Sequence, residues 1–475
     1  MENVQNKKDL TSYGKAVAFL AIEIIAILAF NLGNSLIFYT ILSVVLTGIL
    51  FFVLRRQINK DGLASLGFFL FPILIYGILN AISYFNQDPA YNLYGYGFGL
   101  CIIPISLTCI AAVGYLCSIN PNFKIKQVLL VIYSAVALIT VINLMATLID
   151  FAPFHTLLYK GKYIYYEGRP SSVPVSEMAY GLIGFKMTQL SVSYVSLFPS
   201  VLLSSFIPLF YSKYREDRKA FILYLSFGIL GVISLVLMPT IMTILSDIVV
   251  VIVLALVVLT EKFHLAKPMK YVSIVIAALV GIALIVAILN NLNGDNFVKS
   301  LISGNRLLNK LFNGNRLAAA YNNVLDGLVD DYKAFGTPTF EQIEYPNGTP
   351  FTGSLLFDNF ITGGIFGNVF FIFTMVVGIR RMFMYFKTSD DRKQDKMLMF
   401  GFVLSFLAYS LVTYSSKPFI FEDTLVPVYE NGLFFVVLMI FGYCFGKSEL
   451  SKPVKEEVKD EVKESEVTEN EEVSI

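Results

Sequence analysis

Histidine and cysteine are both scarce in this chain. Only 2 of its 475 residues are histidine and only 4 are cysteine. His155 and His264 fall on opposite sides of the membrane predicted below, so they do not indicate a shared metal centre. All four cysteines fall within predicted membrane spans, so they indicate neither a disulfide framework nor a CxxC metal site. We therefore expect no bound metal.

Charge is scarce as well. Charged residues make up 15% of the chain, hydrophobic residues make up 56%, and the mean hydropathy is +0.67. A soluble globular protein carries about 25% charged residues, so the composition excludes that class and predicts a membrane protein. Apolar stretches of about 17 to 25 residues, which can cross a hydrocarbon core of about 30 Å, recur along the chain. They predict an all-α, polytopic helical membrane protein with about 12 transmembrane helices. The predicted spans are 16–32, 34–54, 62–83, 98–118, 127–149, 190–211, 220–238, 241–260, 271–289, 355–379, 397–416 and 430–446.

Lysine and arginine give the orientation, since they favour the cytoplasmic side of a membrane. With the N-terminus inside, 26 of the 36 Lys and Arg residues fall in predicted inner segments and 10 in outer ones. Nine of those ten lie in two long loops, where the charge rule has little force. We therefore expect a protein of the bacterial cytoplasmic membrane with both termini in the cytoplasm. The first apolar stretch lacks a small-residue cleavage site, so we expect a retained anchor.

The spans and loops divide the chain into six predicted regions. The last of them carries 10 acidic residues, 5 lysines and no aromatic residue, which predicts disorder. The regions are transmembrane helices 1–5 at 1–149, an extracytoplasmic loop at 150–189, transmembrane helices 6–9 at 190–289, a large extracytoplasmic loop at 290–354, transmembrane helices 10–12 at 355–446, and a disordered, charged cytoplasmic tail at 447–475.

The two extracytoplasmic loops are longer than simple connections need to be, which indicates that they form a site. The first contains the aromatic run YKGKYIYYEGRPSSVPVSEMAYG at 159–181, in which tyrosines precede an arginine and a glutamate. Its candidate residues are Tyr163, Tyr165, Tyr166, Arg169 and Glu177.

The second loop contains two Gly-Asn-Arg triplets, which end in Arg306 and Arg316. The residues before Arg316 favour a turn that starts a helix, so this arginine falls in a first helical turn. A cation there opposes the helix macrodipole unless an anion such as phosphate lies between the guanidinium and the free backbone N–H groups. Alternatively, Arg316 lies on lipid headgroups or pairs with Asp330 or Asp331. The two arginines are about 280° apart on a continuous helix, so they do not share a helical face.

Asp358 and Asn359 fall where the tenth predicted span leaves the outer interface. Apolar neighbours such as Phe357 and Phe360 partly desolvate the carboxylate, which suits a general base. The alternative is that Asp358 caps the helix. The glycines that follow, at 363, 364 and 367, predict a thin helix face that allows close approach to a neighbour.

Two acids, Glu23 and Asp247, fall within predicted spans. Intramembrane carboxylates are costly and indicate function by default. Proton coupling would indicate a transporter, whereas hydrogen bonding between helices would indicate a structural role.

These motifs together resemble the O-antigen polymerase and ligase superfamily, the Wzy-like enzymes that polymerise capsule, exopolysaccharide or O-antigen repeat units. Such proteins have about ten to fourteen spans and one dominant outer loop late in the chain. The chain has Asp358 where ligase-like members have His, which favours a polymerase. The matching segments are GRPSSVPVSEMAYG at 168–181, NGNR at 313–316, AFG at 334–336 and FDNFITGGIFG at 357–367.

The resemblance implies a metal-independent, inverting glycosyltransferase that needs no cofactor and binds no nucleic acid. It would transfer a growing glycan from polyprenyl diphosphate to an undecaprenyl-diphosphate-linked repeat unit on the outer face of the lipid bilayer. A flippase and a chain-length regulator of the same pathway are the protein partners that it implies. Its implied base is Asp358, or else Glu177. The other implied roles are diphosphate binding by Arg169, Arg306 and Arg316 and sugar binding by Tyr163, Tyr165, Tyr166 and Asn359.

Two other functions are left open. A flippase or transporter of lipid-linked oligosaccharide would have internal repeats and broken helices near the midplane, and the sequence has no convincing halves. A ligase-like glycan transferase would share the same loops.

Overall fold

The structure of this protein is a computed structural model. It describes residues 14, 15, 17, 19–23, 25, 36–55, 58, 60–85, 103–120, 123–149, 165, 166, 169, 170, 198–212, 215, 217–237, 247–256, 355–412 and 432–450.

Helices overlap every predicted span except 271–289, which lies outside the described residues. Their bounds are α2 (Leu36–Leu54), α3 (Lys60–Phe85), α5 (Ile103–Ile119), α6 (Ile125–Ile149), α8 (Phe198–Ser204), α9 (Phe206–Leu209), α10 (Arg218–Leu237), α16 (Leu355–Thr388), α17 (Lys393–Val412) and α18 (Gly432–Leu450). A further apolar helix runs over Asp247–Leu256, and helical residues occur between 14 and 25.

Three helical stretches are long and apolar enough to cross a membrane by length and composition. They are Gly62–Leu79 of α3, Arg218–Leu235 of α10 and Ile365–Thr388 of α16. The protein is therefore helical and membrane-spanning, as predicted. The number of spans and the sides on which the loops lie stay predictions.

One predicted span is interrupted at a single residue, Ser205, whose backbone stays in the helical region. The sequence predicts a single helix at 190–211, but within its described part α8 ends at Ser204 and α9 begins at Phe206. Pro208 explains the break, because it has no N–H to donate to the carbonyl of Ser204 four residues earlier. The Ser205 hydroxyl lies between the two helices and is 2.6 Å from the carbonyl oxygen of Leu202 and 2.9 Å from that of Tyr224 on α10.

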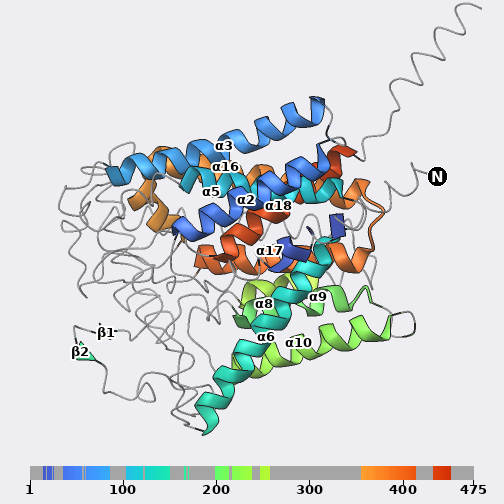
Figure 1. Cartoon of the computed structure of the whole chain (residues 1–475). Helices are drawn as coiled ribbons and strands as arrows, with labels where there is room; N and C mark the ends of the chain where they lie inside the picture. Colours follow the sequence, from blue (N-terminus) through green and yellow to red (C-terminus); the bar gives the residue numbers. More distant parts are fainter. Residues whose placement is uncertain are drawn as a thin grey trace, which may run out of the picture.

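Helix α18 is the buried axis of the larger group of helices. It lies between α17 on one side and α3, α5 and α16 on the other (Figure 1), and it is buried from Leu433 to Phe445. Its main partner is α5, and the two backbones approach closely where glycines face them. A side chain at Gly114 would overlap the backbone of Met439, and one at Gly442 would overlap the backbone of Ala111. Small residues thus set this crossing, as is common between membrane helices.

A second group of helices consists of α6, α8, α9 and α10. Helix α17 joins the two groups, because it packs against α8, α9 and α6 as well as against α16 and α18. The close approach of Gly401 on α17 to the backbone and side chain of Ser204 on α8 brings the groups together.

The glycines of α16 behave differently from the prediction. At Gly367 an added Cβ would meet no atom of the described residues within 4 Å, so this glycine does not provide a close approach there. The close approach on α16 occurs at Gly378, where a Cβ would overlap the ring of Phe441 on α18. Gly363 and Gly364 have no described side-chain environment.

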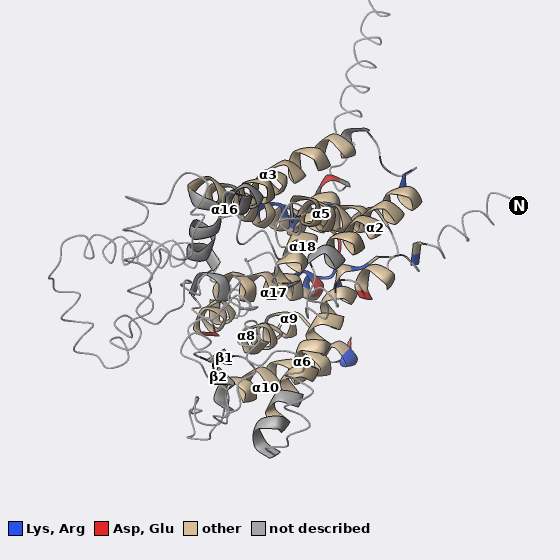
Figure 2. Cartoon of the chain, turned by 60° about the vertical axis from the view of Figure 1, so that its left-hand side comes forward, with Lys and Arg blue, Asp and Glu red and all other residues tan. Residues whose placement is uncertain are grey.

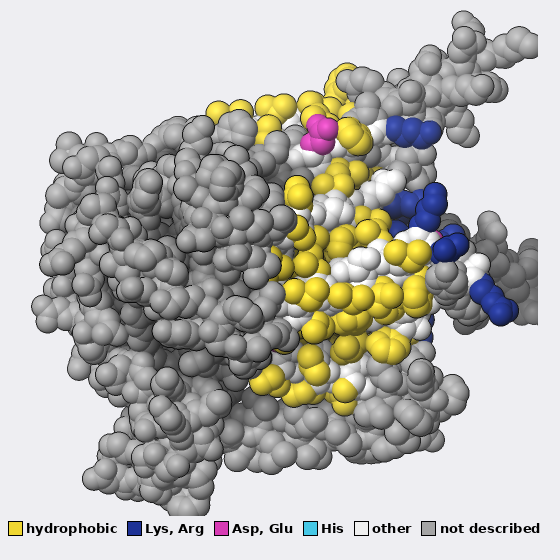
Figure 3. Space-filling model, turned by 90° about the horizontal axis from the view of Figure 1, so that it is seen from below, with side chains coloured by type: hydrophobic (Ala, Val, Ile, Leu, Met, Phe, Trp, Pro, Cys, Tyr) yellow, Lys and Arg dark blue, Asp and Glu magenta, His cyan; other side chains and the backbone are white. Residues whose placement is uncertain are grey.

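The outer surface of the helices is apolar. Phe68 on α3 is 78% exposed, and Phe52, Phe71 and Val376 are also more than half exposed. Figure 3 shows hydrophobic side chains over the visible described surface and the Lys and Arg side chains at its right-hand end. Water would disfavour such a surface, whereas the hydrocarbon of a bilayer matches it.

The α5–α18 crossing gives a test of the packing. Gly442→Ala adds one methyl group against the Ala111 backbone, so we expect it to destabilise the protein by about 1–3 kcal/mol through overpacking. The matched control is Gly48→Ala on α2, where a Cβ would meet nothing within 4 Å. In that helix alanine should be neutral or stabilising by up to about 1 kcal/mol. Thermal unfolding of both variants in detergent checks the difference, and equal unfolding temperatures would contradict this account.

Candidate functional site

The tyrosine and arginine run of the first predicted loop contains the strands of the structure. Strand β1 (Tyr165–Tyr166) pairs antiparallel with β2 (Arg169–Pro170), and two residues separate them in the sequence, which is the length of a tight hairpin. The register pairs Tyr166 with Arg169 and Tyr165 with Pro170. Tyr166 and Arg169 are thus direct cross-strand neighbours, and Tyr165 belongs to the adjacent pair.

Asp358 and Asn359 lie in the first turns of α16, which begins at Leu355. The structure describes both residues by their backbone. Asp358 is three residues inside the helix and therefore does not occupy the N-cap position, which precedes the first helical residue. The choice between a base and a helix-end acid stays a prediction. An acid in this part of a helix still interacts favourably with the helix macrodipole.

The remaining sequence-predicted site residues lie outside the described residues. They are Tyr163, Glu177, Arg306 and Arg316. The structure therefore does not test whether the two outer loops converge. Where side chains are described, no group of three or more His, Cys, Asp or Glu comes together as a metal site.

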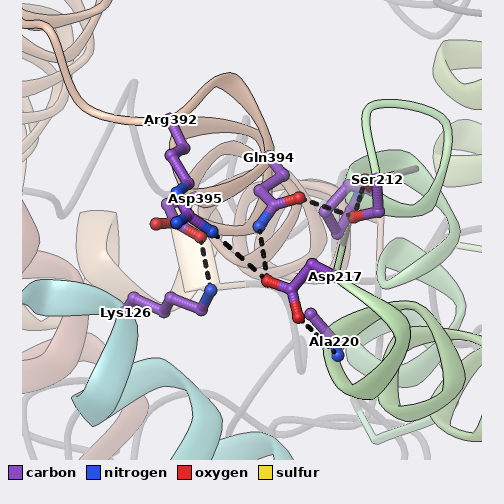
Figure 4. Close-up of polar contacts among 8 residues, drawn as sticks. Lys126, Ser212, Asp217, Ala220, Arg392, Gln394 and Asp395 are labelled. Atoms are coloured by element: carbon purple, nitrogen blue, oxygen red, sulfur yellow. Dashed lines mark hydrogen bonds and ion pairs between the residues drawn. The ribbon is translucent and has the colours of Figure 1, made fainter. Parts of the chain in front are cut away.

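A polar network that the sequence did not predict joins several helix ends (Figure 4). Asp217 precedes α10 and accepts a hydrogen bond at 3.2 Å from the backbone N–H of Ala220, so it caps this helix. Its other carboxylate oxygen lies 3.3 Å from Arg392 Nη1 and 3.3 Å from Gln394 Nε2. The Ala220 hydrogen bond, followed by the polar and charged neighbours, holds the pKa of Asp217 below its ordinary value.

The same network reaches α6 and the end of α9. Lys126 Nζ lies 2.9 Å from Asp395 Oδ1, so the two side chains form an ion pair. The Ser212 hydroxyl donates to Gln394 Oε1 at 3.0 Å. The side chains of this network belong to segments that the sequence predicts to be cytoplasmic. The sequence indicated the network only through the many Lys and Arg residues of those segments. Their pairing depends on the fold, which the sequence pattern does not give.

Two more contacts join segments predicted to lie on this side. Arg381 on α16 lies 3.8 Å from Glu449 on α18, and its guanidinium carbon lies 4.1 Å from the ring centroid of Phe445. The Asn120 side chain donates to the carbonyl oxygen of Gly14 at 3.0 Å. These contacts gather five chain segments at one end of the helices, and Figure 2 shows much of the blue ribbon of Lys and Arg toward its right-hand side. The assignment of this end to the cytoplasm stays a prediction.

The two intramembrane acids differ in their surroundings. Glu23 is exposed. Asp247 is 1% exposed, and its Oδ1 accepts a hydrogen bond from the Ser200 hydroxyl of α8 at 2.5 Å. This contact is the interhelix hydrogen bond that the sequence offered as the alternative to proton coupling. Around it, Ser405 of α17 donates to the Ser200 carbonyl oxygen at 2.9 Å, and Tyr133 of α6 lies 2.6 Å from the Ser204 hydroxyl.

The two clusters, at Asp217 and at Asp247, hold helices and helix ends together. The network at Asp217 consists of paired charges and satisfied donors, and the cluster at Asp247 links helices of the second group. The Ser200 hydroxyl does lie beside the Asp247 carboxylate, but both side chains are buried, with exposed fractions of 0% and 1%. Among the described residues, the site residues that the sequence predicts lie in the β1–β2 hairpin and at the start of α16.

Comparison with known protein families, with curated proteins and with solved structures finds no match for this chain.

The Asp217 network gives a pH-dependent prediction. Because the pKa of Asp217 is lowered in the folded protein, its ionised form stabilises the fold at pH values above the ordinary value of 3.8. That contribution is lost as the pH falls through the lower, folded pKa. Asp217→Asn should therefore be less stable than the unmodified protein at pH 7, and the difference should shrink below about pH 4.

Thermal unfolding in detergent at a series of pH values measures this difference. The matched control is Asp390→Asn, which removes the charge of an exposed acid in the turn between α16 and α17. We expect this substitution to change the thermal stability little, both at pH 7 and below about pH 4. A difference for Asp217→Asn that stays constant from pH 7 to pH 3 would refute the role of the ionised carboxylate.

Proposed function

We propose that the chain is a polysaccharide polymerase of the bacterial cytoplasmic membrane. In this proposal it has about 12 transmembrane helices, both termini in the cytoplasm, and two long extracytoplasmic loops at 150–189 and 290–354. It transfers a growing glycan of capsule, exopolysaccharide or O-antigen from undecaprenyl diphosphate to a lipid-linked repeat unit on the outer face. The resemblance of its loop motifs to the O-antigen polymerase and ligase superfamily suggests this activity.

The observation that supports the proposal most is the length of α16. Asp358 precedes Arg380 by 22 residues of continuous helix, which corresponds to a rise of about 33 Å. This rise is close to the hydrocarbon thickness of about 30 Å. Arg380 is exposed, and the residue that follows it, Arg381, pairs with Glu449 at the end of the helices described above. If Arg380 lies at the inner interface, Asp358 and Asn359 lie at the outer one, where the glycan of a lipid-linked substrate is found.

The β1–β2 hairpin supports the proposal in a second way. Its register makes a tyrosine and an arginine, Tyr166 and Arg169, direct cross-strand neighbours. An aromatic ring offers a stacking surface to a sugar, and a guanidinium binds phosphate oxygens in a bidentate manner. A diphosphate-linked sugar presents both of these groups next to each other.

The proposed reaction is a single inverting displacement. A hydroxyl of the acceptor repeat unit attacks the anomeric carbon of the donor glycan, and the bond from this carbon to the diphosphate oxygen breaks. Asp358, or else Glu177, takes the proton of the attacking hydroxyl. Arg169, Arg306 and Arg316 stabilise the negative charge that grows on the departing undecaprenyl diphosphate. Tyr163, Tyr165, Tyr166 and Asn359 hold the sugars, and no metal or cofactor takes part.

The test of this function is the lipid-linked species that accumulates in a strain lacking the gene. A polymerase predicts single repeat units exposed on the outer face of the membrane and no long polymer. Enzymatic labelling of glycans on intact cells and on inverted vesicles distinguishes the two faces. Units trapped on the cytoplasmic face would instead support the flippase, and long polymer that is not attached to its acceptor would support the ligase.

A point substitution tests the role of Asp358. Asp358→Asn keeps the size of the side chain but removes the base, so we expect polymer formation to fall by about 10²–10⁴-fold, the usual contribution of general base catalysis. Polymer length on gels, with the amount of protein in the membrane determined in parallel, measures this loss. The control Asp390→Asn, at the opposite end of α16, should leave polymer unchanged. Full activity of Asp358→Asn would transfer the role to Glu177, which Glu177→Gln then tests.

A further inference from the structure

One face of α16 is exposed along its length and changes from apolar to cationic. Val369, Phe373 and Val376 are each about half exposed. They are followed at spacings of three or four residues by Arg380, Phe383 and Lys387, which are also exposed. Residues at such spacings lie one above another on a helix. We call these six residues the α16 stripe.

The cationic end of the stripe is hollowed. An open groove of about 500 Å³ is lined by Val376, Ile379, Arg380, Phe383, Met384 and Lys387. Phe383 forms the aromatic part of the groove and packs against two other rings. Its ring centroid lies 6.1 Å from that of Phe386 and 6.4 Å from that of Phe400 on α17. The groove thus combines an apolar surface with two cations that are about 10 Å apart along the helix axis.

Neighbouring arginines on α16 have different surroundings. Arg381 points into the bundle, where it pairs with Glu449 and lies over the ring of Phe445. Arg380 and Lys387 form no ion pair or hydrogen bond with any residue that the structure describes. The inward arginine therefore has a structural role, whereas the outward cations are available to a ligand on the membrane side of the helix.

We propose that the α16 stripe binds an anionic phospholipid. The phosphate of the headgroup lies between Arg380 and Lys387, and an acyl chain lies in the groove over Phe383 and Val376 and continues along Val369. The stripe has two cations at one end and apolar side chains along the rest. An anionic phospholipid has a negative headgroup at one end and apolar acyl chains along the rest, so the two match. A zwitterionic phospholipid has no net charge, so it would gain less from the two cations. This proposal depends only on the membrane-spanning character of α16 and is independent of the proposed polymerase activity.

The test uses the purified full chain in detergent and measures the binding of individual lipids by native mass spectrometry. We expect phosphatidylglycerol to bind more tightly than phosphatidylethanolamine of the same acyl chains. Each cation near an anionic lipid surface contributes a factor of about five in affinity. The double variant Arg380→Gln and Lys387→Gln should therefore lose about 25-fold in affinity for phosphatidylglycerol and little for phosphatidylethanolamine. The conservative swap Arg380→Lys and Lys387→Arg should keep the preference.

A second double variant serves as the matched control. Arg55→Gln and Lys393→Gln remove the same charge from exposed cations that lie over the rings of Phe52 and Tyr211, away from the groove. They should leave the preference for phosphatidylglycerol in place. Equal loss in both double variants would mean that net charge alone attracts the lipid, and an unchanged preference in the Arg380 and Lys387 variant would also overturn the proposal. The chain could also form a dimer without lipid that the Arg380 and Lys387 variant abolishes and the control variant does not. That result would overturn the proposal and assign the stripe to a second copy of the chain.

Discussion

The close crossing of α5 and α18 is the contact on which the rest of the larger helix group depends. In a bilayer the hydrophobic effect does not drive helices together, because lipid tails are as apolar as the side chains. Close van der Waals packing and hydrogen bonds must do so instead. Gly114 and Gly442 allow the two backbones to approach, and α18 becomes buried on all sides. Helices α3 and α16 then pack around this pair, with Gly378 of α16 accepting the ring of Phe441.

The second helix group is held together in a different way. Serine hydroxyls bond to backbone and side-chain oxygens across helices, as Ser405 does to the Ser200 carbonyl and Ser205 does to the Tyr224 carbonyl. Short hydroxyl side chains can satisfy polar groups in a low-dielectric interior at little steric cost. At the junction of α8 and α9, the Ser204 and Ser205 hydroxyls also donate to the carbonyl oxygens of Val201 and Leu202. Asp247 belongs to this group, and its bond to Ser200 ties one more helix to α8.

The sequence predicted the helices far better than it predicted their partners. Helix positions follow from hydropathy, because the bilayer requires about 20 apolar residues per crossing and backbone hydrogen bonds within each segment. The break at Ser205 was also readable in principle, since Pro208 removes a donor four residues after Ser204. The pairing of α5 with α18 was not, because glycines are spread along the chain and only the fold decides which of them face a neighbour. Gly367 was expected to provide such a contact and does not, whereas Gly442 does.

The sequence predicted which residue types form the candidate site. It did not predict how these residues are arranged in space. The hairpin register pairs Tyr166 with Arg169 and Tyr165 with Pro170, whereas the sequence had grouped the tyrosines with the arginine. A tyrosine run alone does not distinguish the two faces of a ribbon, because successive residues of a strand alternate in direction. The polar network at Asp217 was missed for a related reason. It joins residues at the starts of α6, α10 and α17, which are far apart in the sequence.

Helix α16 connects the two ends of the protein and relates the two proposals to each other. Its 34 residues form one continuous helix, so the distance from Asp358 to Arg380 is fixed by the helical rise. A phospholipid held at Arg380 and Lys387 would fix the depth of this helix in the membrane at one interface. The position of Asp358 at the other interface would then be fixed as well, because a helix transmits an axial displacement along its whole length. A base that must meet a sugar hydroxyl next to a membrane-bound diphosphate requires such a fixed depth, since a displacement of about 1 Å can cost about 10²-fold in rate.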